Sequence, residues 1–75
     1  MARHDATAEV TGSVWKVLVA VGDAVAEGAE VAILESMKME IPVYAPVSGQ
    51  VAEIAAPEGA AVEEGAAVIV IEDGS

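Results

Sequence analysis

The chain has 75 residues, no cysteine and no cluster of histidines, so one small domain with neither a disulfide framework nor a zinc site is expected. Its formal charge of -10 disfavours nucleic-acid binding, because such a surface repels phosphate groups. The charged N-terminus precedes no apolar signal region, and no apolar run reaches the roughly 18 residues of a membrane helix, so we expect a soluble cytoplasmic protein without a membrane span.

The first half of the chain predicts short β-strands separated by glycine turns. Residues 1–5 are charged and are expected to be flexible. In chain order, the elements that follow are a turn at Thr11-Gly12, a strand over 14–19, a turn at Gly22-Asp23, an extended piece at Val25, a turn at Gly28 and a strand over 31–35. Helix is disfavoured, since β-branched residues dominate and no segment combines helical periodicity with a cap.

The next segment, 35–40, predicts a hairpin, because the apolar run 31–34 leads into it and residues 39–44 alternate in character. Its tip is unusual. Favoured two-residue turns need positive φ and therefore draw on Gly, Asn or Asp, whereas the tip offers Met37 and Lys38. A local rule broken without structural gain points to function. Pro42 lacks an amide donor, so we expect the outgoing strand to lie at a sheet edge or to turn that donor position to solvent.

The second half repeats the first, because residues 8–36 align on 45–73 without a gap. Identical pairs include Gly12/Gly49, Gly22/Gly59, Glu27/Glu64 and Gly28/Gly65. The second half therefore predicts strands over 51–55 and 68–72, a short extended piece at Val62, and the same turns. The best core candidates are positions that are apolar in both halves, such as Val14/Val51, Val31/Val68 and Leu34/Ile71. Regularly spaced short strands of this kind indicate an all-β sandwich or barrel with one shared core.

An exposed lysine on a turn is most commonly a solvated charge. Lys38 differs because Met37 and Met39 place large apolar side chains beside it on a surface turn. Flexible, polarizable methionines favour recognition by another protein. The segment Glu35-Ser36-Met37-Lys38-Met39-Glu40 is similar to the attachment motif of biotinyl domains, whose core is Ala-Met-Lys-Met or Ser-Met-Lys-Met. The similarity extends to the turns at 12–19, 22–25, 28, 45–49 and 59.

The resemblance implies one domain over residues 1–75, a flattened barrel-sandwich of two four-stranded antiparallel sheets related by a pseudo-two-fold axis. It implies that a biotin protein ligase attaches biotin covalently to Lys38, with Glu35, Ser36, Met37 and Met39 as motif flank and ligase-recognition positions. It further implies a non-catalytic carrier, monomeric on its own, that takes carboxybiotin from a biotin carboxylase to a carboxyltransferase. No catalytic residue and no metal ligand are expected.

Two alternatives keep the same fold. A lipoyl carrier is the nearest, although those domains usually show Asp-Lys-Ala at the tip where this chain has Met37-Lys38-Met39. An unmodified structural or interaction module would leave Lys38 bare. An enzyme finds little support in the sequence, because Ser36 and Ser48 lack a matched histidine and His4 lies in the segment expected to be flexible.

Overall fold

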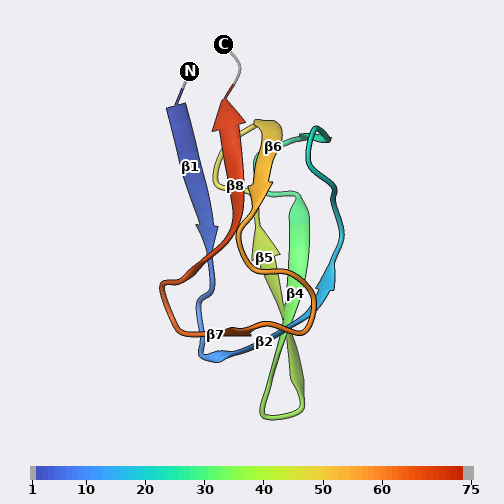
Figure 1. The fold of residues 1–75 in the computed structure, drawn as a ribbon, viewed down its shortest axis with the longest axis vertical. Coiled ribbons are helices and arrows are strands. Elements are labelled where there is room, and N and C mark those ends of the chain that lie inside the picture. Colours follow the sequence, from blue (N-terminus) through green and yellow to red (C-terminus); the bar gives the residue numbers. More distant parts are fainter. Residues whose placement is uncertain (1, 74–75) are drawn as a thin grey trace.

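The computed structural model describes residues 2–73, which form eight β-strands and no helix (Figure 1). In chain order the strands are β1 (Ala2–Thr7), β2 (Gly12–Val17), β3 (Ala24–Val25), β4 (Glu30–Ser36), β5 (Met39–Tyr44), β6 (Gly49–Ile54), β7 (Ala61–Val62) and β8 (Ala67–Asp73). They make two four-stranded antiparallel sheets, ordered β1-β8-β6-β3 and β5-β4-β2-β7, which confirms the expected fold class. Over the same range there is no helix with the length and apolarity to cross a membrane.

Each strand of the first half recurs in the second half after a shift of 37 residues, from Ala2 to Met39 and from Glu30 to Ala67. Even the irregularities recur. The pairing of β2 with β4 is interrupted at Trp15, and the pairing of β6 with β8 is interrupted at Ala52, each a one-residue β-bulge. The internal pseudo-two-fold repeat is thus present in the backbone as well as in the sequence.

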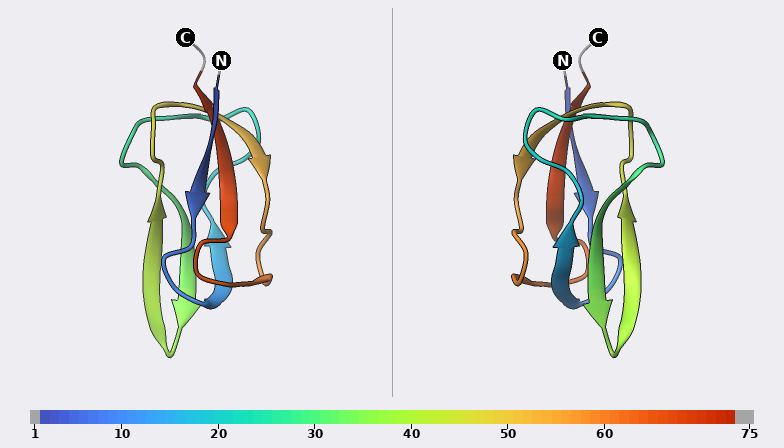
Figure 2. Two further views of the ribbon diagram at one scale, coloured as in Figure 1. Left: turned by 90° about the vertical axis from the view of Figure 1, so that its left-hand side faces the viewer. Right: turned by 90° about the vertical axis from the view of Figure 1, so that its right-hand side faces the viewer.

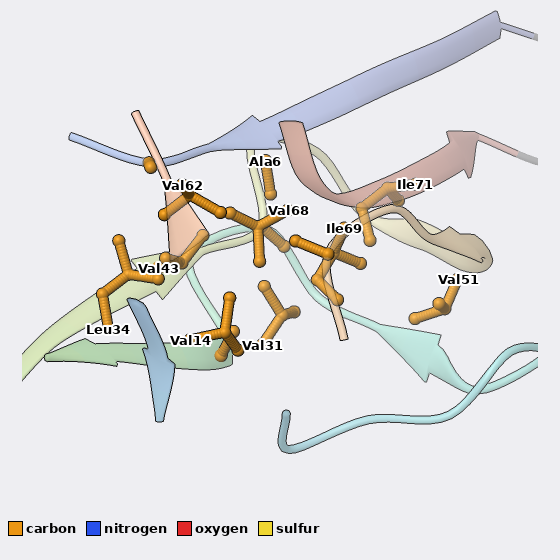
Figure 3. Packing of buried hydrophobic residues seen from close by; sticks show 14 residues of the cluster. Ala6, Val14, Val31, Leu34, Val43, Val51, Val62, Val68, Ile69 and Ile71 are labelled. Atoms are coloured by element: carbon orange, nitrogen blue, oxygen red, sulfur yellow. The ribbon is translucent and has the colours of Figure 1, made fainter. Parts of the chain in front are cut away.

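The core lies between the two sheets and is built from aliphatic side chains, with consecutive residues buried in β4 and β8 (Figure 3). The largest fully buried side chains are Leu34, Ile69, Ile71, Val14, Val31, Val51 and Val68. Burying each such side chain contributes about 1.5–3 kcal/mol. The sequence prediction that positions apolar in both halves form the core is confirmed at Val14/Val51, Val31/Val68 and Leu34/Ile71.

The expectation that residues 1–5 are flexible is wrong for Ala2–Asp5, which belong to β1, while Met1 lies outside the described residues. Strand β1 buries only the Ala6 side chain, so its sequence shows no apolar alternation. It is held instead by main-chain pairing with β8 and by ion pairs. Arg3 lies 3.8 Å from both Glu53 and Glu72, and His4 Nε2 lies 2.9 Å from Asp73 Oδ2.

Strands β2 and β6 begin at Gly12 and Gly49, two residues earlier than predicted, where the sequence suggested turns. A glycine is needed there for close approach. A Cβ on Gly12 would overlap the Glu35 carbonyl oxygen, and a Cβ on Gly49 would overlap that of Glu72. The glycines therefore let each strand lie directly against the end of its neighbour. The prediction that Pro42 marks an edge strand is confirmed, since β5 is the first strand of its sheet.

The His4–Asp73 pair should make the stability of the fold depend on pH. The hydrogen bond with His4 is the main cause that lowers the pKa of Asp73 below its ordinary 3.8, followed by the hydrogen bond from the Ala2 amide. A carboxyl with a depressed pKa adds stability above its unfolded pKa and loses it as the pH falls through the folded value. We expect Asp73→Asn to destabilise the fold slightly at pH 7, with the difference from the wild type vanishing well below pH 3.8. Urea unfolding of the variant and the wild type, at pH 7 and well below pH 3.8, measures this difference in stability. A stability difference that does not change with pH would contradict the prediction.

Candidate functional site

The hairpin formed by β4 and β5 projects from one end of the molecule, while the described ends of the chain, in β1 and β8, lie at the other end (Figures 1 and 2). The two strands pair from Glu30 with Tyr44 to Ser36 with Met39. Only Met37 and Lys38 remain for the turn, and their φ angles are +52° and +67°. Positive φ at both central positions is the requirement of a type I′ turn, the tight hairpin turn that normally takes Asn and Gly.

The turn residues are strained by this conformation. An L-residue other than glycine in the left-handed region costs roughly 1–2 kcal/mol, and asparagine and aspartate are the side chains that tolerate it best. Met37 and Lys38 have neither the small size nor the local hydrogen bonds that favour it. Strained backbone of this kind is concentrated at functional sites, which makes the turn the first candidate for one.

We expect Met37→Gly to raise the free energy of unfolding by about 0.5–1 kcal/mol, because glycine adopts positive φ without strain but is more flexible when unfolded. The midpoint of thermal unfolding should rise by several degrees, since ~1 kcal/mol corresponds to about 4–8 °C in a domain of this size. Met39→Gly is the matched control. Met39 lies in a strand without positive φ, so glycine there should lower the midpoint. Equal losses in the two variants would show that the turn is not strained.

The tip carries Met37, the most exposed large hydrophobic side chain among residues 2–73. The Met37 side chain is 92% exposed and that of Met39 is 63% exposed, and Lys38 between them is exposed as well. Within residues 2–73, ion pairs within 4.0 Å are made by Arg3 and, when it is protonated, by His4, so no described carboxylate holds the Lys38 ammonium.

The base of the hairpin is fixed by contacts with the start of β2. The Ser36 hydroxyl donates a hydrogen bond to the Thr11 carbonyl oxygen at 2.9 Å. The Thr11 hydroxyl in turn accepts a bond from the Glu64 amide at 3.3 Å, so the loop before β8 also supports the same corner. Together with the close approach of Gly12 to Glu35, these contacts set where the tip points. A rigid hairpin loses little entropy when a partner binds it.

The two strands that leave the turn carry facing carboxylates. Glu35 of β4 pairs directly with Glu40 of β5, and both side chains are exposed. Like charges at directly opposite positions weaken a sheet. At the corresponding position of the other sheet, Arg3 of β1 pairs with Glu72 of β8, so there the charges attract. The hairpin thus retains a local repulsion that the repeated half of the molecule does not have.

All five expected site residues, Glu35, Ser36, Met37, Lys38 and Met39, lie in this hairpin. Thr11 and Gly12 support this hairpin, a role that could not be predicted from the sequence. The identity of Gly12 with Gly49 was the one available signal, but Thr11 acts through its carbonyl oxygen, which no side-chain pattern reveals. On the same sheet, Trp15 is 42% exposed at its bulge, and Lys16 Nζ lies 5.0 Å from the centre of its ring.

Comparison with known proteins places these features in context. Residues 5–71 match the model of the biotin/lipoyl family described as "Biotin-requiring enzyme". The match covers most of the chain, including the whole β4–β5 hairpin and every strand except the start of β1 and the end of β8.

Individual relatives agree with the family model. A biotin/lipoyl attachment protein of Bacillus subtilis is 60% identical over 37 residues, which are 49% of this chain and 51% of that protein. A biotinylated protein TB7.3 homolog of Mycobacterium leprae is 50% identical over 44 residues, which are 59% of this chain and 62% of that protein. The aligned part of the chain thus spans about half to three fifths of these small relatives.

Among solved structures, the urea carboxylase of Kluyveromyces lactis superposes with a TM-score of 0.88 at 42% identity. The superposition covers 96% of this chain and 6% of that enzyme. The similarity therefore concerns one small domain within a much longer polypeptide.

Proposed function

The chain belongs to the biotin/lipoyl attachment family, and from this membership we propose that it is a biotin carrier whose Lys38 is the attachment point. The observation that carries the proposal is the position of the Lys38 amine. It stands on a strained two-residue turn between two exposed methionines. This turn lies at the opposite end of the molecule from the described ends of the chain. Among residues 2–73 no ion pair holds this amine, so it is available for modification.

The residues around Lys38 suit covalent attachment. A biotin protein ligase would need a neutral amine to attack an activated carboxyl group, and the exposed Lys38 can lose its proton inside the ligase. Met37 and Met39 would supply apolar contact to the ligase, with Glu35 and Ser36 flanking them. The product is an amide, so the formal charge becomes one unit more negative.

In a carrier, the bound biotin supplies the chemistry of carboxyl transfer and the protein supplies position. Strands β4 and β5 present the Lys38 stem as the root of a long tether, and the Ser36 hydroxyl bond to Thr11 keeps that root in place. Tethering raises the local concentration of the group at any active site that holds the carrier. We therefore propose that the partners are a biotin carboxylase and a carboxyltransferase, between which this non-catalytic protein carries the carboxyl group.

A lipoyl carrier is the second candidate, because the family and the Bacillus subtilis relative are named for both groups. One experiment separates the candidates. The protein is produced in cells that contain both a biotin ligase and a lipoyl ligase, its intact mass is measured, and the modified peptide is sequenced. We expect the mass of one biotinyl group on Lys38 and capture by avidin. A lipoyl group on Lys38 would support the second candidate, and an unmodified Lys38 would overturn both.

A further inference from the structure

Met37 and Met39 are exposed to solvent because of the backbone that carries them. The positive φ of Met37 holds its side chain outside the sandwich, and Met39 is the first residue of β5, opposite Ser36 at the very end of the sheet. Neither side chain is part of the hydrophobic core or of the partly buried layer around it. With 92% and 63% of their surfaces in water, both thioethers are open to small reagents.

These two residues hold all the sulfur of residues 2–73, because the chain has no cysteine and its third methionine is Met1. Peroxides oxidise exposed methionine to the sulfoxide. A lone pair of the sulfur attacks one oxygen of hydrogen peroxide, and the O–O bond breaks. Sulfur is oxidised by two electrons and the peroxide is reduced. The leaving hydroxide takes the proton of the hydroxyl now bound to sulfur, which leaves the sulfoxide and water.

We propose that Met37 and Met39 form a peroxide-sensitive modification site that controls whether Lys38 can receive its group. The inference rests on the proposed function, since it concerns the same hairpin. Oxidation replaces an apolar thioether by a polar sulfoxide at the two positions on either side of the acceptor amine. A ligase that covers these side chains would then have to bury a polar group without a matching donor, which is unfavourable.

The fold itself should tolerate the modification. Because Met37 and Met39 make no core contacts, sulfoxides there leave the buried side chains of β4 and β5 unchanged. Oxidation therefore acts on recognition and not on stability. The change is also reversible, because methionine sulfoxide reductases restore the thioether. The difference in exposure further predicts that Met37 is oxidised faster than Met39.

The experiment compares the unmodified protein before and after treatment with dilute hydrogen peroxide, which catalase then removes. Peptide mass spectrometry locates the added oxygen atoms and separates those at Met37 and Met39 from any at Met1. The rate of biotin incorporation by purified ligase is then measured over a range of carrier concentrations. We expect kcat/KM to fall about tenfold or more, and methionine sulfoxide reductase to restore it.

The matched control is the double variant Met37→Leu and Met39→Leu, which keeps the apolar volume and removes the sulfur. Its kcat/KM should be the same before and after peroxide. The proposal is overturned if the wild type, with sulfoxide at both positions, incorporates biotin at the untreated rate, or if reductase fails to restore a lost rate. A peroxide-induced fall in the thermal midpoint that accounts for the loss would overturn it too.

Reversal in the wild type needs no substitution, so the result does not depend on how well the leucine variant is recognised. The two levels of inference also remain separable. If untreated protein takes up no biotin at Lys38, the proposed function fails and this inference fails with it. If untreated protein is biotinylated and the oxidised protein is biotinylated equally well, only this inference fails.

Discussion

Lys38→Arg is expected to abolish biotin incorporation completely and to leave the stability of the fold unchanged. Arginine remains protonated in proteins, so its guanidinium cannot act as the neutral nucleophile that amide formation needs. The side chain at position 38 is exposed and makes no ion pair within residues 2–73, so the exchange removes no packing and no charge contact. An avidin blot after production with a biotin ligase measures the incorporation, and thermal unfolding tests the fold.

The chain offers a close control for this experiment, since Lys16 and Lys38 are its two lysines. Lys16 lies within strand β2 of the same sheet and not on a turn, and its ammonium stands over the Trp15 ring. Lys16→Arg should keep full biotin incorporation. Biotin remaining on the Lys38→Arg protein, or lost from the Lys16→Arg protein, would show that the attachment point has been assigned to the wrong residue.

Gly12→Ala and Gly49→Ala are expected to destabilise the protein equally and to affect biotin incorporation unequally. In each variant the new Cβ overlaps a carbonyl oxygen of the neighbouring strand, that of Glu35 for Gly12 and that of Glu72 for Gly49. Because backbone must shift to relieve the overlap, we expect a loss of about 1–3 kcal/mol of unfolding free energy in both. Only the first shift moves the base of the Lys38 hairpin, and small displacements of a reacting group can lower rates by up to about 100-fold.

Biotin incorporation should therefore be compared at a temperature at which both variants are fully folded. We expect kcat/KM for the ligase to fall about tenfold with Gly12→Ala and to stay near the wild-type value with Gly49→Ala. The repeat provides a matched control for the loss of stability, since the two substitutions create the same kind of overlap at equivalent positions of the two sheets. Equal kcat/KM values for the two variants would mean that Gly12 supports the fold without positioning the hairpin.

The repeat explains why much of the architecture could be predicted from the sequence. Glycines shared by both halves mark the same turns, and valines shared by both halves, such as Val31/Val68, mark the same buried positions. Strand β1 could not be found in this way. Its counterpart β5 buries Val43 and partly buries Ile41, whereas β1 has Ala6 and His4 at those positions and depends on main-chain pairing and on ion pairs. Pairing of that kind has no apolar periodicity.

The position of the candidate residues on an exposed hairpin could be predicted from the sequence, but the contacts that hold the hairpin could not. The tip attracted attention because Met37 and Lys38 do not suit a tight turn, and the structure shows the turn that they adopt, with positive φ at both. The supporting contacts were hidden for physical reasons. The Thr11 carbonyl that binds Ser36 is a backbone group, and the pairing of Glu35 with Glu40 depends on strand register.

The shift of 37 residues makes the described chain ends equivalent to the two residues that flank the Lys38 turn. Ser36 and Met39 face each other below the turn, and Asp73 and Ala2 face each other at the equivalent place in the other sheet. The gap between Asp73 and Ala2 thus lies where the other sheet has the Met37-Lys38 turn. Circular permutants, with a short linker closing that gap and new termini at a surface loop, should therefore fold. Two halves with equivalent strands, related by a constant shift, are also expected if the gene arose by duplication and fusion of a shorter one.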